Sequence, residues 1–230
     1  MTHLRDVKPV ERPDTENCSL TLVIDVSNSM NTKTPSGKTR IQEVNDGINQ
    51  MINELKTDIR LGSIVDLSII TFHDKGKHEV YQGFCAVSNV PTPIDLKTGG
   101  DTYAADALAA ALNNIKQRRT KYNAGCWKPW LVFITDGELH DDVSQIGREI
   151  RQYEKDGQLR TLCFGVPGFD PQEMVLLSDK VFQIVNYNFA QFFSWVAKSQ
   201  VAVIQSGTPA PDKEIPLPPV SSEVFIQMSV

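Results

Sequence analysis

Short apolar runs alternate along this chain with segments whose apolar residues recur at helical spacing. The runs are LTLVID (20–25), VDLSIITF (65–72), WLVFITD (130–136), RTLCFGV (160–166) and VFQIV (181–185). A short continuous apolar run is typical of a strand that is buried on both faces. Strands that alternate with helices pair in parallel, because each helix carries the chain back to the end where the next strand begins. The sequence therefore predicts an α/β fold with a doubly wound, mostly parallel central sheet and helices on both faces.

The segments between the runs predict the helices. Apolar residues at helical spacing indicate helices over about 40–56, 103–118, 143–153 and 189–203, with a short helix near 171–178. The segment HEVYQGFCAV (78–87) alternates polar and apolar residues instead. This alternation is typical of a half-buried strand, and we expect one antiparallel strand at the edge of the sheet.

The two ends of the chain differ from its middle. Residues 1–16 are polar, and the stretch from Ser206 onward holds five prolines: Pro209, Pro211, Pro216, Pro218 and Pro219. We therefore expect a polar N-terminal tail over 1–16, one domain over 17–205 and a Pro-rich C-terminal tail without helix over 206–230. The last residues, EVFIQMSV, are too apolar to stay in water, so we expect them to dock on the domain or on a neighbour.

Composition excludes several classes of protein. The net charge is −5, and we find no basic stripe with interleaved aromatic residues, so a nucleic-acid partner is not expected. No apolar run approaches the roughly 18 residues of a membrane span, and the start of the chain does not resemble a secretory signal. The four cysteines are scattered without a C-x-x-C pair, which indicates packing in a reducing compartment. We expect a soluble, cytoplasmic protein.

One stretch, LVIDVSNSMN (22–31), ends a predicted buried strand with three oxygen-bearing side chains. Asp25, Ser27 and Ser29 occur at alternate positions, so in an extended loop they point the same way. In a doubly wound sheet, ligands bind at the carboxyl ends of the strands, where the strand order reverses. Carboxylate and hydroxyl oxygens suit a hard divalent cation, Mg²⁺ first, with Mn²⁺ or Ca²⁺ as alternatives.

Two further candidates complete this set of ligands. Thr102 lies in GGDTYAADAL before a predicted helix, and Asp136 ends the central strand in FITDGE. A switch point between strands brings such loops together, so the sequence predicts one metal site. The alternative is that these Asp, Ser and Thr residues only cap helices. Asp101 is an accessory candidate, which either adds charge beside the metal or is only a helix cap or a solvated loop residue.

Two other features give weaker signals. The segment SGKT (36–39) resembles part of a phosphate-binding loop, but Thr32 stands where that motif requires a glycine. We therefore interpret 31–40 as a solvated connection beside the metal site. His73, His78 and His140 lack the spacing of metal ligands.

The D-x-S-x-S of Asp25, Ser27 and Ser29 resembles the metal-ion-dependent adhesion site of von Willebrand factor A domains. That family places a threonine five residues before an Ala-Leu pair, as Thr102 stands here, and an aspartate at the end of a strand like FITDG, as Asp136 does. The likeness covers about 17–204. Within the family the chain looks most like the bacterial tellurium-resistance-associated TerY type, through QFFSWVAKSQVAVIQS (191–206) and the LPP that follows. The sequence departs from the family at Asn28, where glycine is usual.

The resemblance implies a non-catalytic, metal-dependent protein-binding module. The five family residues leave one metal position open, and a partner protein would fill it with an Asp or Glu carboxylate. The implied partners are a kinase, a phosphatase or a Ter-type stress protein, in a bacterial stress-response or tellurium-resistance system. The alternative is a metal-dependent phosphohydrolase with Asp25 as nucleophile. That chemistry requires a second carboxylate two residues later as general acid, where Ser27 stands, so we favour the binding module.

Overall fold

A computed structural model describes residues 16–122, 125–207, 218–219 and 221–228. Within these residues, one sheet has the strand order β3-β2-β1-β4-β5-β6-β7. The strands are β1 (Cys18–Asp25), β2 (Val65–Phe72), β3 (His78–Ala86), β4 (Trp130–Thr135), β5 (Arg160–Gly165), β6 (Val181–Ile184) and β7 (Phe225–Gln227). The five inner strands pair in parallel, and β3 and β7 pair antiparallel at the two edges. The predicted mostly parallel sheet is confirmed, with a second antiparallel edge strand that the sequence did not indicate.

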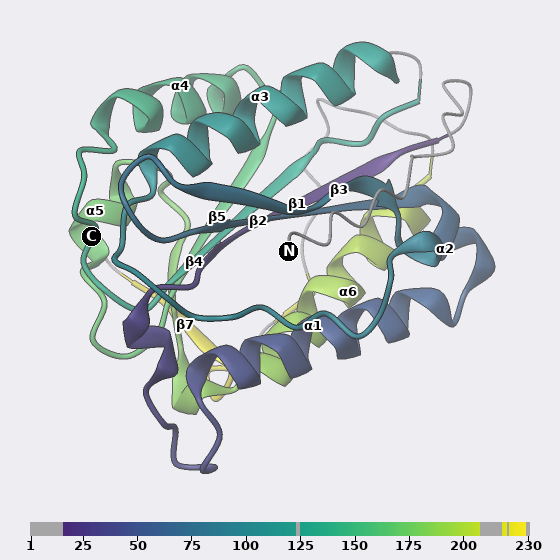
Figure 1. The fold of residues 1–230 in the computed structure, drawn as a ribbon. Helices are drawn as coiled ribbons and strands as arrows, with labels where there is room; N and C mark the ends of the chain where they lie inside the picture. Colours follow the sequence, from purple (N-terminus) through teal and green to yellow (C-terminus); the bar gives the residue numbers. More distant parts are fainter. Residues whose placement is uncertain (1–15, 123–124, 208–217, 220, 229–230) are drawn as a thin grey trace.

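Helices cover both faces of the sheet. They are α1 (Arg40–Lys56), α2 (Ile59–Ile64), α3 (Ala105–Lys121), α4 (Ser144–Lys155), α5 (Pro171–Val175) and α6 (Phe189–Gln205). Helices α3 and α4 lie over one face, and α1 and α6 lie over the other (Figure 1). None of the helices in the described part of the chain is long and apolar enough to cross a membrane.

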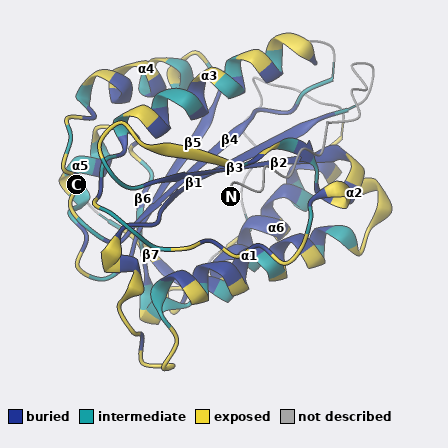
Figure 2. Cartoon of the chain, viewed as in Figure 1, coloured by how far each residue is buried: buried dark blue, intermediate teal, exposed yellow. Residues whose placement is uncertain are grey.

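Each face of the sheet has its own hydrophobic core. In β1, Leu22 packs into the core beneath α1 and α6, whereas the next residue, Val23, packs into the core beneath α3 and α4. Every residue of β1 is therefore buried, as the apolar run predicts, while β3 at the edge is only partly buried (Figure 2). Helices α1 and α6 approach closely at Gly47, where a Cβ atom would lie 2.5 Å from the ring of Phe193.

The C-terminal segment contributes the last strand. Strand β7 pairs with β6, and Phe225 is buried against Phe164, Phe182 and Trp195. The expected docking of the apolar end is thus observed for 224–228, so the sheet extends into the segment that the sequence assigns to the tail. Residues 1–15 of the predicted N-terminal tail and 208–217 of the C-terminal one lie outside the described residues. The domain boundaries stay a prediction.

The strand order reverses between β1 and β4. From β1 the chain proceeds to β2 and β3 on one side, and it then returns through α3 to β4, β5 and β6 on the other side. The loops that follow β1 and β4 therefore begin side by side at the reversal point, which is where doubly wound folds bind ligands.

Candidate metal site

Asp25 is the last residue of β1, and its carboxylate is fixed by two hydrogen bonds. Its Oδ1 accepts from the backbone N–H of Ser27 at 2.8 Å, and its Oδ2 accepts from the hydroxyl of Thr135 at 2.6 Å. Thr135 ends the neighbouring strand β4, so the carboxylate is held between the two strands at which the sheet order reverses. The residue is fully buried.

The surroundings of Asp25 disfavour its charged form in the absence of a cation. The pKa of Asp25 is raised to about 6, chiefly by burial and also by the nearby negative charge of Asp136, while the hydrogen bonds from Thr135 and Ser27 oppose the rise. A buried carboxylate beside a second carboxylate is stabilised by a bound cation, because the positive charge offsets both the burial and the repulsion.

The two serines connect Asp25 to Asp136. The hydroxyl oxygens of Ser27 and Ser29 lie 2.8 Å apart, and the Ser29 hydroxyl donates to Oδ1 of Asp136 at 2.6 Å. A short 3₁₀ helix, Asn28–Asn31, follows Ser27, but the Ser27 side chain makes no capping hydrogen bond to it. The alternative of a helix cap is therefore wrong for Ser27. The hydrogen bond from Ser29 to Asp136 brings the D-x-S-x-S segment and the FITDG strand end together.

Thr102 reaches the site through backbone contacts. The N–H of Asn28 donates to the carbonyl of Gly100 at 3.0 Å, and the N–H of His140 donates to the carbonyl of Thr102 at 2.8 Å. The loop over 99–102 therefore lies between the loops that follow β1 and β4. Thr102 itself is buried. This position is consistent with its predicted role, although the hydrogen-bond network above joins only the other four candidates.

Asp101 does not cap the helix that follows it. The N–H groups of Ala104 and Ala105 donate to the carboxylate of Asp141 at 2.9 and 2.8 Å, so Asp141 caps α3 from the loop after β4. Asp101 is exposed, and its own N–H donates to Asp74. The capping interpretation is wrong, because a residue distant in sequence satisfies the helix terminus.

Arg40 is part of the site, and the sequence analysis missed it. Its Nη1 donates to Oδ2 of Asp136 at 2.6 Å, and the two side chains are only 13% and 0% exposed. Arg40 is the first residue of α1, directly after Thr39, whose side chain caps the helix in a capping box with Gln42. The capping sequence could have placed Arg40 at the helix start, but not beside Asp136.

Tyr187 supports Arg40 from its other side. The Arg40 guanidinium lies 5.5 Å from the centre of the Tyr187 ring, within the range of a cation–π contact, and Nη2 lies 3.5 Å from the phenol oxygen. Tyr187 and the preceding Asn186 both have left-handed backbone conformations, with φ of 55° and 52°. Residues other than glycine rarely adopt these backbone angles, and such backbone strain concentrates at functional sites.

The donor set fits a hard divalent cation. It combines two carboxylates with serine and threonine hydroxyls, and one cation, the Arg40 guanidinium, already binds Asp136. Among the described residues, no three His, Cys, Asp or Glu side chains gather as metal ligands. A cation at this site would therefore depend on the hydroxyls as well as on the two carboxylates.

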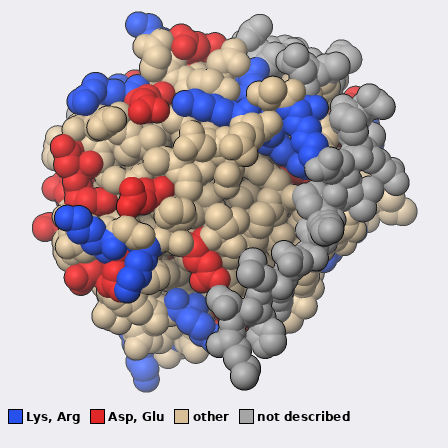
Figure 3. Space-filling model, turned by 45° about the horizontal axis from the view of Figure 1, so that its top comes forward, with Lys and Arg blue, Asp and Glu red and all other residues tan. Residues whose placement is uncertain are grey.

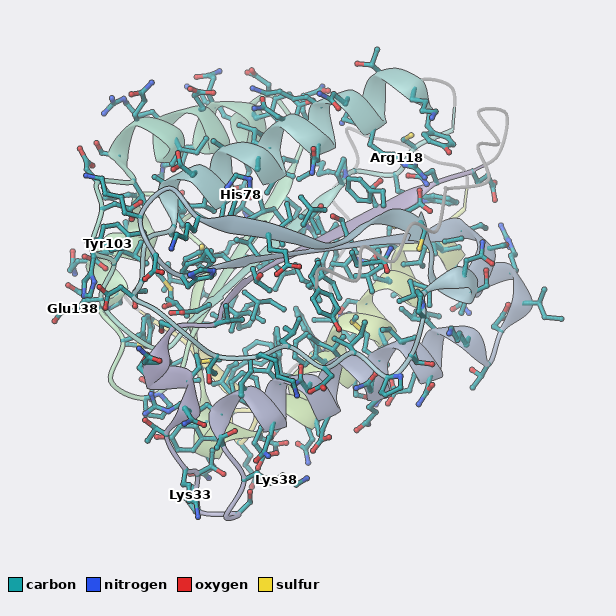
Figure 4. All side chains as sticks on the ribbon, viewed as in Figure 1. Lys33, Lys38, His78, Tyr103, Arg118 and Glu138 are labelled. Carbon is teal, nitrogen blue, oxygen red and sulfur yellow. The ribbon has the colours of Figure 1, made fainter. Side chains whose placement is uncertain are left out.

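Charged side chains of both signs surround the site. Tyr103 and Glu138, close in sequence to Thr102 and Asp136, lie at the same end of the molecule (Figure 4). Asp and Glu side chains lie along the left edge of Figure 3 together with Lys and Arg side chains, at the end where the parallel strands finish. A cavity of about 350 Å³ borders the site at Gly99 and Gly100 and is also lined by Asp74, Asp95 and Lys97. Asp74 pairs with Lys77 and Asp95 pairs with Lys97, so these carboxylates are already partly neutralised.

The family model of the von Willebrand factor type A domain matches residues 20–138, which include all five predicted ligands. The chain belongs to this family. A comparison with curated protein sequences found no significant match.

Solved structures share the fold at low sequence identity. The pilus adhesin SpaC from Lactobacillus rhamnosus GG is 15% identical with a TM-score of 0.64, over 82% of this chain and 31% of the adhesin. Proximal thread matrix protein 1 from the mussel byssus, with a zinc-occupied MIDAS motif (the metal-ion-dependent adhesion site), is 17% identical with a TM-score of 0.56, over 84% and 47%. Manganese-loaded TRAP protein of Plasmodium vivax is 15% identical with a TM-score of 0.50, over 79% and 73%.

These likenesses establish the fold of the von Willebrand factor A domain for this chain. The chain spans less than half of the adhesin and of the byssus protein. Two of these structures hold a divalent metal, zinc in one and manganese in the other.

Proposed function

We propose that this chain is a non-catalytic module that binds a partner protein through a divalent cation. One observation carries the proposal: Asp25, Ser27, Ser29 and Asp136 form a single hydrogen-bond network at the reversal point of the sheet. In this proposal the two serines and Thr102 are direct ligands, while Asp25 and Asp136 act partly through water. Asp101 adds negative charge nearby without contacting the ion.

We propose Mg²⁺ as the ion, with Mn²⁺ or Ca²⁺ as alternatives. Hydroxyl and carboxylate oxygens are hard ligands, and a site with few protein ligands suits an ion that retains water. Zinc and manganese in the two metal-bearing relatives support a divalent cation without selecting Mg²⁺.

The partner would supply the missing ligand as an Asp or Glu side chain. Neutral hydroxyl ligands leave the ion much of its charge, so an external carboxylate binds it strongly. By the resemblance to the TerY type, the partner is a kinase, a phosphatase or a Ter-type protein in a cytoplasmic stress-response or tellurium-resistance system. The family membership supports the binding role, and the setting rests on that narrower resemblance alone.

The burial of Asp25 argues against the phosphohydrolase alternative. A nucleophilic carboxylate must present an oxygen to the phosphorus atom, but Asp25 is fully buried and both of its oxygens accept hydrogen bonds from the protein. Ser27 occupies the position of the general acid, and a serine does not protonate a leaving group at neutral pH.

A pull-down from a lysate of the source cells tests the proposal. Wild-type protein with Mg²⁺ is expected to retain a partner that is lost in EDTA and lost with Asp25→Ala. Asp46→Ala is the matched control, because it also removes one carboxylate but from an exposed pair with Lys38. Retention of the same partner in EDTA would show that another surface binds it. Hydrolysis of a phosphomonoester by the Mg²⁺-loaded wild type, and not by Asp25→Ala, would establish the alternative.

A further inference from the structure

The charge of the candidate site is not set by its carboxylates alone. Arg40 donates to Oδ2 of Asp136 at 2.6 Å, while Ser29 donates to Oδ1 of the same carboxylate at 2.6 Å. Both oxygens of Asp136 are thus engaged by side chains of this chain. Asp25 has no such counter-ion, since its partners are a backbone N–H and a hydroxyl. The site therefore carries one compensated and one uncompensated carboxylate.

Arg40 is held in place independently of Asp136. Tyr187 packs against the guanidinium at 5.5 Å, from a turn between β6 and α6 whose backbone is left-handed at Asn186 and Tyr187. The backbone N–H of Arg40 also donates to the carbonyl of Thr32 at 3.0 Å. Two segments other than the end of β4 therefore hold this positive charge beside the site.

The hydrogen bonding of Arg40 is incomplete. Only Nη1 makes a short contact, and Nε is buried without a hydrogen-bond partner among the described residues. A guanidinium that served only to tie two elements together would be expected to use its paired N–H groups on the carboxylate. The single contact to Asp136 instead makes Arg40 a local positive charge that neutralises this carboxylate.

We propose that Arg40 sets the balance between holding the metal and binding the partner's carboxylate. This inference rests on the proposed function and concerns the same site. By neutralising Asp136, Arg40 weakens the attraction of the site for a divalent cation. It also leaves the bound cation with less compensated charge, so an incoming carboxylate is attracted more strongly. Arg40 is a positioning and specificity-determining residue, and its loss shifts the two affinities in opposite directions.

The test uses the full chain, Mn²⁺ as the metal probe and acetate as the carboxylate probe. Mn²⁺ affinity is measured by electron paramagnetic resonance of the unbound ion. Acetate binding to the Mn²⁺-loaded protein is measured by water-proton relaxation, which falls when bound water is displaced. For Arg40→Gln, which retains a hydrogen-bond donor without the charge, we expect Mn²⁺ to bind about tenfold more tightly and acetate several-fold more weakly.

Matched variants separate charge from structure. Arg40→Lys retains the charge and is expected to resemble the wild type. Lys38→Gln removes one positive charge from an exposed position two residues before Arg40 and is expected to change neither affinity. Arg40→Met is the second neutral variant, and melting in EDTA checks that each variant folds.

The outcomes distinguish this inference from the proposed function. Tighter Mn²⁺ binding with weaker acetate binding in the neutral variants, and neither change in Arg40→Lys, supports the inference. Equal or weaker Mn²⁺ binding in the folded neutral variants overturns it, because a purely structural role for Arg40 predicts that loss. Unchanged acetate binding also overturns it. A wild type that binds no Mn²⁺ overturns the proposed function and the inference with it.

Discussion

Two buried aspartate–arginine pairs lie at opposite ends of the sheet and differ in their balance of charge. The basal pair, Asp66–Arg118, lies where β2 begins, and the site pair, Asp136–Arg40, lies where β4 ends. Figure 4 shows Arg118 at the opposite end of the molecule from Tyr103 and Glu138. In the basal pair, Oδ2 of Asp66 accepts from Nε of Arg118 at 2.9 Å, from its Nη2 and from the amide of Asn17.

We call the basal pair closed, because its one acid and one base neutralise each other. We call the site pair open, because the site holds a second carboxylate, Asp25, without a counter-ion. The Arg118 guanidinium packs on the rings of Tyr122 and Phe84, with its central carbon 4.3 and 5.5 Å from their centres, and one base matches one acid. At the other end, Arg40 makes one short hydrogen bond, to Asp136, and the second carboxylate of the site, Asp25, has no counter-ion. The same two residue types thus form a structural element in one place and an incompletely neutralised site in the other.

The largest expected effect is on stability at the basal pair. Asp66→Ala leaves the Arg118 charge buried without a counter-ion, and we expect a loss of about 3–5 kcal/mol in the free energy of unfolding. Asp136→Ala should lose less, about 1–2 kcal/mol, because it also removes the repulsion between Asp136 and the buried carboxylate of Asp25. Urea denaturation in EDTA measures both. If both variants lost the same unfolding free energy, the contrast between the closed basal pair and the open site pair would be wrong.

The pH dependence of the unfolding free energy should reveal the titration of Asp25. Its pKa is about 6 when folded and about 3.9 when unfolded, so the protonated form adds stability that is complete below pH ~4 and is lost as the pH rises through 6. In EDTA, Asp25→Asn should therefore gain up to about 3 kcal/mol over the wild type between pH 4 and 7.5. Unfolding curves for both proteins across this range measure the difference. If stability varied with pH in the same way in both proteins, the pKa of Asp25 would not be raised in the folded state.

The parts that the sequence predicted are those that depend on local pattern. The strand VDLSIITF matches β2 over 65–72, and the helix expected over about 40–56 matches α1, because apolar spacing reports directly on burial. Asp25, Ser27 and Ser29 could be placed together for the same reason, since the end of a buried strand and the spacing of two residues are both visible in the chain. Asp136 followed from the same logic at β4.

The parts that the sequence missed depend on distant contacts. Arg40 and Asp136 are 96 positions apart, and no local pattern links them. Strand β7 has three residues and pairs with β6 across a long connection, so its register exists only in the folded chain. Helix α2 is a single short stretch of six residues, which Asp58 caps through the N–H groups of Arg60 and Leu61. Such elements are set by tertiary packing rather than by periodicity.

Metal binding should stabilise one end of the molecule independently of the other. At a Mn²⁺ concentration one hundred times the dissociation constant, the wild type should gain about 2.7 kcal/mol. A basal variant such as Asp66→Asn should gain the same amount, because distant sites contribute additively. Asp25→Ala should gain nothing. Differential scanning calorimetry with Mn²⁺ and with EDTA measures the gain, and a smaller gain in the basal variant would reveal coupling between the two ends.

The smallest expected effects on stability concern two serines, each of which donates a hydrogen bond to a polar side chain. Ser19 donates to the amide oxygen of Asn17 at 2.7 Å in the basal cluster and is buried, whereas Ser29 donates to Asp136 and is exposed. Ser19→Ala leaves a buried acceptor without a donor, and we expect a loss of about 1–2 kcal/mol. Ser29→Ala should lose only about 0.5 kcal/mol, because water replaces the hydroxyl at an exposed position.

The two serine variants should rank in the opposite order for metal affinity. Ser29→Ala removes a proposed ligand and should weaken Mn²⁺ binding by about tenfold or more, a loss of at least ~1.4 kcal/mol, whereas Ser19→Ala should leave it unchanged. Urea denaturation in EDTA and Mn²⁺ titration, carried out on the same preparations, give the two rankings. If Ser29→Ala bound Mn²⁺ as tightly as the wild type, the serine would be only a hydrogen-bond donor to Asp136. The assignment of a metal to this end of the sheet would then lose one of its three proposed hydroxyl ligands.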